Sequence, residues 1–213
     1  TITNLDSGID LETEIALSNN NLNTLNNKDN FLKKGNALSL KLIKEQINLG
    51  GINSSFLFSH WQNSKDFKVL SRSKDVNFNE DWDLIDTTKF GPEQQTSFGV
   101  ALNLGSKLNS NMNYSTYSLG DILKKRKTLD FDYKGSMIHE MRINYSLVES
   151  DKFYNKIDGD IYFFDKKIKP YISYDSESKE SAYKYNDIRF GLKRASNSPF
   201  FISYGIRSDD LTS

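Results

Sequence analysis

The sequence contains no cysteine, and this absence excludes disulfide bonds and thiolate metal sites. Only 3 of the 213 residues are proline, which cannot donate a hydrogen bond to a β-ladder, so the composition is compatible with long strands. No segment approaches the roughly 18 consecutive apolar residues that a membrane-spanning helix requires. The sequence therefore argues against an α-helical membrane protein.

The chain also has no excess of charge of either sign. Its 28 basic residues equal its 28 acidic residues, so no net field attracts nucleic acid, and we expect no nucleic-acid partner. The only histidines are His60 and His139, which lie on different predicted strands, and no cysteine can partner either of them. We therefore predict a non-enzymatic protein without catalytic residues.

What the sequence does have is aromatic residues, 11 Tyr and 14 Phe, and apolar residues at every second position. In residues 97–118 the alternating set begins with Phe98, Val100, Leu102 and Leu104. This period of two is typical of a half-buried antiparallel strand. The same pattern recurs in 9–17, 38–42, 52–58, 129–133, 141–147, 157–163, 168–174, 188–192 and 200–206.

These patterns predict an all-β fold, an antiparallel meander of about eleven long strands forming a barrel-like or strongly curved sheet. Polar stretches at 165–167, 175–181 and 195–199 predict hairpin turns. We see no linker and expect residues 1–213 to form a single β domain, a segment of a longer chain whose neighbouring strands cover its edges. Residues 60–95 are predicted to be a long irregular loop region that holds any ligand.

The apolar stripe has two interpretations. The predicted strands are about 9–13 residues long, against an average of about 5–6 in globular domains and about 9–11 in membrane barrels. This length favours an outer-envelope barrel or barrel segment with a structural, transport or surface-attachment role, located at the bacterial outer membrane or cell surface, with lipid as a partner. The alternative is a soluble or secreted β-sandwich module that binds carbohydrate or protein.

The stretch "FKVLSRSKDVNFNEDWDL", residues 67–84, followed by long hairpins rich in Tyr and Asn, resembles a segment of large, uncharacterised envelope proteins of Bacteroidetes-like bacteria. Those proteins resemble long arrays of antiparallel β-hairpins in or near the outer membrane. The resemblance implies a location and an architecture, and it implies no activity.

One candidate metal site lies in this stretch. If the segment were extended, Asn77, Asn79, Asp81 and Asp83 would project to one side and offer the oxygen ligands that Ca²⁺ prefers. No other cofactor is implied. The alternative is a solvated acidic strand with Trp82 beneath it.

Aromatic residues supply a second candidate. Trp61, Trp82, Tyr114 and Tyr117 could form a carbohydrate-stacking surface or a girdle at a membrane interface. Ordinary cross-strand aromatic packing is the competing interpretation.

Overall fold

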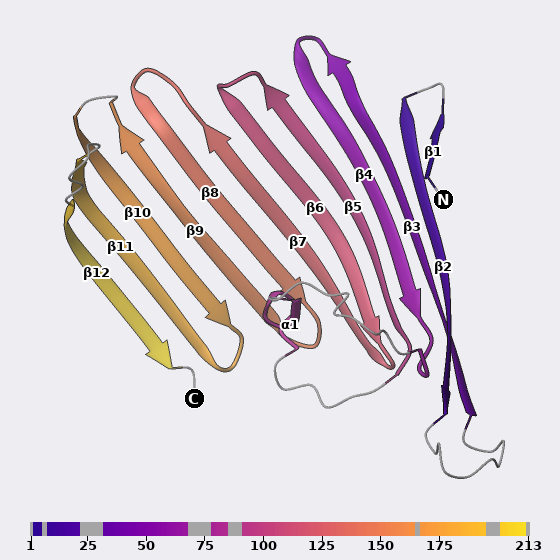
Figure 1. Cartoon of the computed structure of the whole chain (residues 1–213). Coiled ribbons are helices and arrows are strands. Elements are labelled where there is room, and N and C mark those ends of the chain that lie inside the picture. The colour runs from indigo at the N-terminus through magenta and orange to yellow at the C-terminus, as the bar shows by residue number, and fades with distance from the viewer. Residues whose placement is uncertain are drawn as a thin grey trace. The chain divides into compact units, whose positions relative to one another are not determined.

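A computed structural model describes residues 2–5, 8–21, 32–67, 78–84, 91–164, 167–194 and 201–211. The described strands form one antiparallel sheet of 12 strands in chain order, β1 to β12, as Figure 1 shows. The predicted all-β antiparallel meander is therefore confirmed, with one more strand than expected. The sheet is not closed, because its order ends at β1 and at β12.

The strands are β1 (Ile2–Leu5), β2 (Ile9–Asn21), β3 (Leu32–Leu49), β4 (Ile52–Asn63), β5 (Glu93–Leu104), β6 (Leu108–Leu119), β7 (Ile122–Tyr133), β8 (Ile138–Glu149), β9 (Phe153–Phe163), β10 (Ile168–Lys179), β11 (Tyr183–Arg194) and β12 (Phe201–Leu211).

Short hairpins join most of these strands. Gly50 and Gly51 connect β3 to β4, and both have positive φ (62° and 95°), as a tight two-residue hairpin requires. The hairpin turn predicted at 175–181 is present but shorter, at 180–182, because β10 continues to Lys179. The carboxylates of β10 accept hydrogen bonds from tyrosines of neighbouring strands, for example Asp175 from Tyr185.

The predicted loop region 60–95 overlaps the last residues of β4 and the first residues of β5. Its described residues include a single helical turn, α1 (Phe78–Asp81). Residues 68–77 and 85–90 lie outside the described part.

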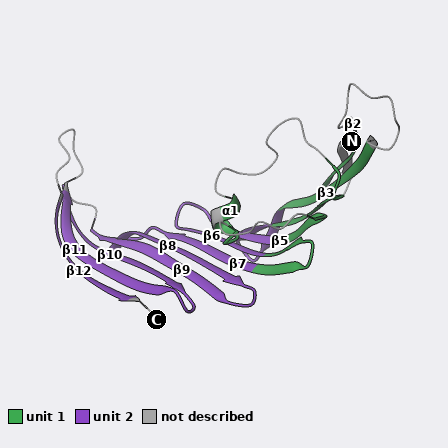
Figure 2. Ribbon diagram, turned by 90° about the horizontal axis from the view of Figure 1, so that it is seen from below, with its two compact units in different colours: residues 1–45, 56–98, 115–125 green, residues 46–55, 99–114, 126–213 purple. Residues whose placement is uncertain are grey.

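Two compact units divide the chain, coloured separately in Figure 2. Unit 1 comprises residues 1–45, 56–98 and 115–125, and unit 2 comprises 46–55, 99–114 and 126–213. Strands β3 to β7 contribute residues to both units, so the expectation of a single domain stays a prediction.

The buried apolar residues of the described chain are few: Val148 is buried in unit 2, and a cluster of buried apolar residues lies in unit 1. It contains Trp82, Leu84, Tyr117 and Leu119, with Trp61 and Phe78 packed against them. Most other large apolar side chains are half-buried or exposed, because the strands pack sideways into a sheet. Over the described ranges, no helix has the length and hydropathy needed to cross a membrane.

Candidate functional site

Unit 2 presents two chemically different faces, and the strand register defines them. Ile172 of β10 pairs with Phe190 of β11, which pairs with Tyr204 of β12. The neighbouring rows on this face are Tyr174, Ile188 and Ile206, and Pro170, Leu192 and Ile202. We call this surface the apolar face, and it extends over β8 and β9 through Met141, Ile143, Tyr145, Leu147, Ile157 and Ile161.

The apolar face is exposed over large side chains. On β11, Ile188, Phe190 and Leu192 each remain 39–49 % exposed. On β12, Tyr204 is 72 % exposed, because β12 pairs with β11 and with no other described strand. Isolated exposed apolar residues are common on proteins, but a contiguous surface of them indicates an interaction site.

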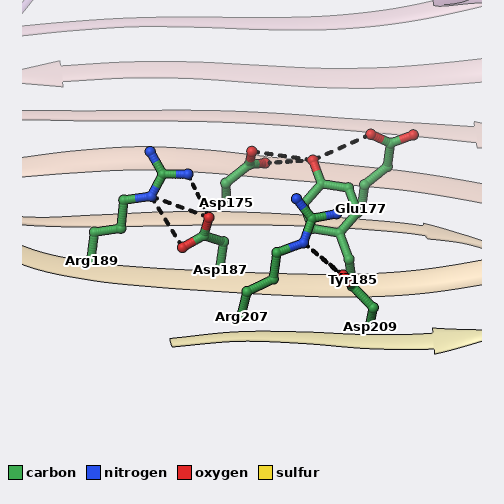
Figure 3. Close-up of polar contacts among 7 residues, drawn as sticks. All are labelled: Asp175, Glu177, Tyr185, Asp187, Arg189, Arg207 and Asp209. Atoms are coloured by element: carbon green, nitrogen blue, oxygen red, sulfur yellow. Dashed lines mark hydrogen bonds and ion pairs between the residues drawn. The ribbon is translucent and has the colours of Figure 1, made fainter. Parts of the chain in front are cut away.

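The opposite surface, here called the polar face, carries a network of ionisable side chains (Figure 3). Asp187 of β11 is 7 % exposed and accepts hydrogen bonds from the Arg189 guanidinium, the shortest being 2.6 Å. The hydroxyl of Tyr185 lies 3.1 Å from the nearer oxygen of Asp175 and 3.5 Å from Glu177.

Further contacts extend this network across strands. Tyr154 of β9 donates a 3.1 Å hydrogen bond to Glu177, and Tyr183 of β11 donates to the same oxygen. On β12, Arg207 pairs with Asp209 at 2.8 Å, and its guanidinium lies 5.0 Å from the centre of the Tyr185 ring. Hydrogen bonds from tyrosines to carboxylates thus link β9, β10 and β11 on the polar face, whereas each Arg–Asp pair lies within one strand.

A hollow of about 500 Å³ lies on this polar face beside the turn between β5 and β6. Polar side chains dominate its lining, including Lys107, Lys134 and Arg142 with Asp132 and Glu140. Arg142 lies 2.7 Å from Glu140 and 3.7 Å from Asp132, so its charge is compensated.

In unit 1 the two faces also differ. The rings of Phe58 and Phe98 contact each other on one face in a tilted arrangement, with centres 5.0 Å apart. Ser97, the residue before Phe98, points to the other face and accepts a 2.8 Å hydrogen bond from Ser115. Tyr117 follows Ser115 by an even step along β6 and therefore shares that second face.

Segment 78–84 packs on this second face through aromatic contacts. The ring of Tyr117 lies 5.3 Å from both Trp82 and Phe78, and 6.3 Å from Trp61. Trp82 is 2 % exposed and Tyr117 is 1 % exposed. In this structure Trp61, Trp82 and Tyr117 therefore pack against one another, as in the alternative to a carbohydrate-binding or membrane-interface surface. Tyr114 points to the opposite face of β6, so the four proposed ligand-binding aromatics do not form one surface.

The extended geometry assumed for the calcium hypothesis is wrong, because α1 begins at Phe78. The amide of Leu84 donates to the Asn79 carbonyl at 2.7 Å, while Asp83 adopts a positive φ of 52°, as at the left-handed end of a helix. Asp83 faces Lys124, whose Nζ lies 3.7 Å from its carboxylate.

Of the remaining proposed ligands, Asn79 is exposed and Asp81 is half-buried, while Asn77 lies outside the described residues. Within the described part of the chain, no group of three or more His, Asp or Glu side chains is placed to hold a metal ion.

Sequence reasoning missed the polar network of β9 to β12 and the contact between Lys124 and Asp83. The alternation of apolar and polar residues along each strand already indicated that the side chains of Asp175, Asp187 and Arg207 project from the polar face. Their meeting depends on the register, in which Asp175 pairs with Asp187 and Asp187 with Arg207.

Comparisons with known proteins found no match: no family model, no curated protein and no solved structure matches this chain.

Proposed function

We propose that this chain is a non-enzymatic segment of an outer-envelope β-barrel, in which the apolar face contacts membrane lipid and the polar face borders a water-filled interior. One observation carries the proposal. On β11, Ile188, Phe190 and Leu192 are exposed on one side, whereas Asp187 and Arg189 are bonded to each other on the other side. Membrane barrels alternate in this way, with apolar side chains outside and polar ones inside.

Strand length and connectivity support the same proposal. β4 to β12 are 11 or 12 residues long, at or just above the about 9–11 residues that a tilted strand needs to cross a bilayer. The meander order is that of an up-and-down barrel. The described sheet has two edges, β1 and β12, and in this proposal strands of a longer chain or a partner pair with them. The role of the barrel is structural, in transport or in surface attachment.

A soluble or secreted module that binds carbohydrate or protein is the second candidate. It is favoured by polar residues that interrupt the apolar face, such as the row Ser176, Asn186 and Ser208. The polar hollow beside Lys107 would then hold the ligand.

Labelling of adjacent residues tests the two candidates. Because the chain has no cysteine, Ile172→Cys and Ser173→Cys each carry one fluorescent label, on opposite faces of β10. In phosphatidylcholine vesicles with brominated acyl chains, we expect lipid to quench the Ile172→Cys label and aqueous iodide to quench the Ser173→Cys label. Quenching of both labels by iodide and of neither by lipid would contradict the membrane proposal and favour the soluble module.

A further inference from the structure

Segment 78–84 lies on the face of unit 1 that carries Ser97 and Ser115, and the residues beneath it depart from the polar character of that face. Gln95, Ser97 and Ser115 form a local hydrogen-bonded group there, with Gln95 donating to Ser97 at 3.0 Å. Where the segment sits, the same face instead carries aromatic or apolar side chains, namely Trp61, Tyr117 and Leu119. The sheet thus offers an apolar surface to this segment, formed by Trp61, Tyr117 and Leu119, and we call these three residues the seat.

A polar contact fixes the segment at its carboxyl end. Lys124 of β7 is only 7 % exposed, and its ammonium group donates a 2.7 Å hydrogen bond to the main-chain oxygen of Asp83. The same group lies 3.7 Å from the Asp83 carboxylate. A buried ammonium group needs such partners, because burial without them is strongly unfavourable.

We propose that segment 78–84 is an inward-folded constriction of the barrel interior, seated on Trp61, Tyr117 and Leu119 and fixed by Lys124. This inference rests on the proposed function, because the seat borders an interior only if its face lines one. Barrels whose interiors are narrowed or plugged by loops or a helix use the same principle. The segment then limits the size of solute that reaches Ser97 and Ser115.

The two tryptophans of the chain make the seating measurable. A Trp61→Phe protein retains Trp82 as its only tryptophan. We expect blue-shifted Trp82 emission that acrylamide quenches weakly. Lys124→Met in this background should shift the emission to the red and raise the quenching constant several-fold. Lys125→Met is the matched control, because Lys125 is exposed and points to the opposite face of β7.

Access to Ser115, on the face of unit 1 that carries the segment, is the second readout. In a Ser115→Cys protein, we expect a small neutral thiol reagent to react readily and a bulky one slowly. Lys124→Met should raise the rate of the bulky reagent several-fold and leave the small one nearly unchanged. An unchanged bulky-reagent rate, despite release of Trp82, would overturn the constriction.

Two controls keep the result interpretable. If Lys124→Met fails to fold, as judged by hydrogen-exchange protection of β10 and β11, Asp83→Asn replaces it, because it removes the carboxylate and retains the main-chain oxygen. Water-exposed Trp82 in the Trp61→Phe protein would overturn this inference alone. If Trp82 emission is blue-shifted and weakly quenched but brominated lipid does not quench the Ile172→Cys label, the proposed function is overturned, and the constriction with it.

Discussion

Arg189 Nη2 lies 2.6 Å from Asp187 Oδ2, and the Arg189 Nε donates to the same carboxylate at 3.1 and 3.2 Å. Both residues lie on the polar face of β11. The contact places a charge-assisted pair at a position where Asp187 is buried between β10 and β12.

Replacing Asp187 tests the energetic role of this pair. We expect Asp187→Asn to lower the free energy of unfolding by more than Asp209→Asn does, because Asp187 is only 7 % exposed and its carboxylate accepts the Arg189 hydrogen bonds. Denaturant unfolding measures the change. Asp209→Asn is the control, because Asp209 and its partner Arg207 are both well exposed and such pairs contribute about 0–1 kcal/mol. Equal losses in the two variants would contradict a special role for Asp187.

The hydroxyl of Tyr185 gives a second prediction. Because it lies within hydrogen-bond reach of Asp175 and Glu177, Tyr185→Phe should lower the free energy of unfolding by about 1–2 kcal/mol. Tyr204→Phe is a matched control on the apolar face, where the side chain is 72 % exposed, and we expect a near-zero change. The same unfolding measurement checks both variants, and a neutral Tyr185→Phe would show that the network adds no stability.

Gly191 of β11 tests the register of β10, β11 and β12. A β-carbon at this position would clash with the Ile202 carbonyl oxygen and would lie 2.6 Å from the Tyr171 ring. We therefore expect Gly191→Ala to destabilise the protein by about 1–3 kcal/mol through overpacking. Gly205→Ala should cost less, since its nearest neighbour is the flexible Arg189 side chain at 3.0 Å. A tolerated Gly191→Ala would contradict the close approach of Tyr171.

The sequence predicts the strands well, because alternation is a local property that each strand displays by itself. The odd spacing of Tyr114 and Tyr117 already indicated opposite faces, and using it would have removed Tyr114 from the aromatic candidate. Residues 175–179 were assigned to the turn because acidic and serine residues are typical of turns, whereas they continue β10. Their stabilising partners, such as Tyr185, come from a neighbouring strand and depend on the register. The seating of segment 78–84 on Tyr117 is equally non-local, so no pattern within the segment indicates it.

Ile188 allows the sharpest test of what covers the apolar face. At the middle of a bilayer, an arginine on the lipid-facing side of a barrel costs about 2–4 kcal/mol. Ile188 is 39 % exposed, so in water the same change should cost much less, within about 1 kcal/mol. We therefore expect Ile188→Arg to lower the free energy of unfolding by about 2–4 kcal/mol in phosphatidylcholine vesicles. The control is Lys184→Arg, four positions earlier on the same face of β11, where a cation is already present and the change should be close to zero. A small effect of Ile188→Arg in vesicles, equal to that of the control, would mean that lipid does not contact this face.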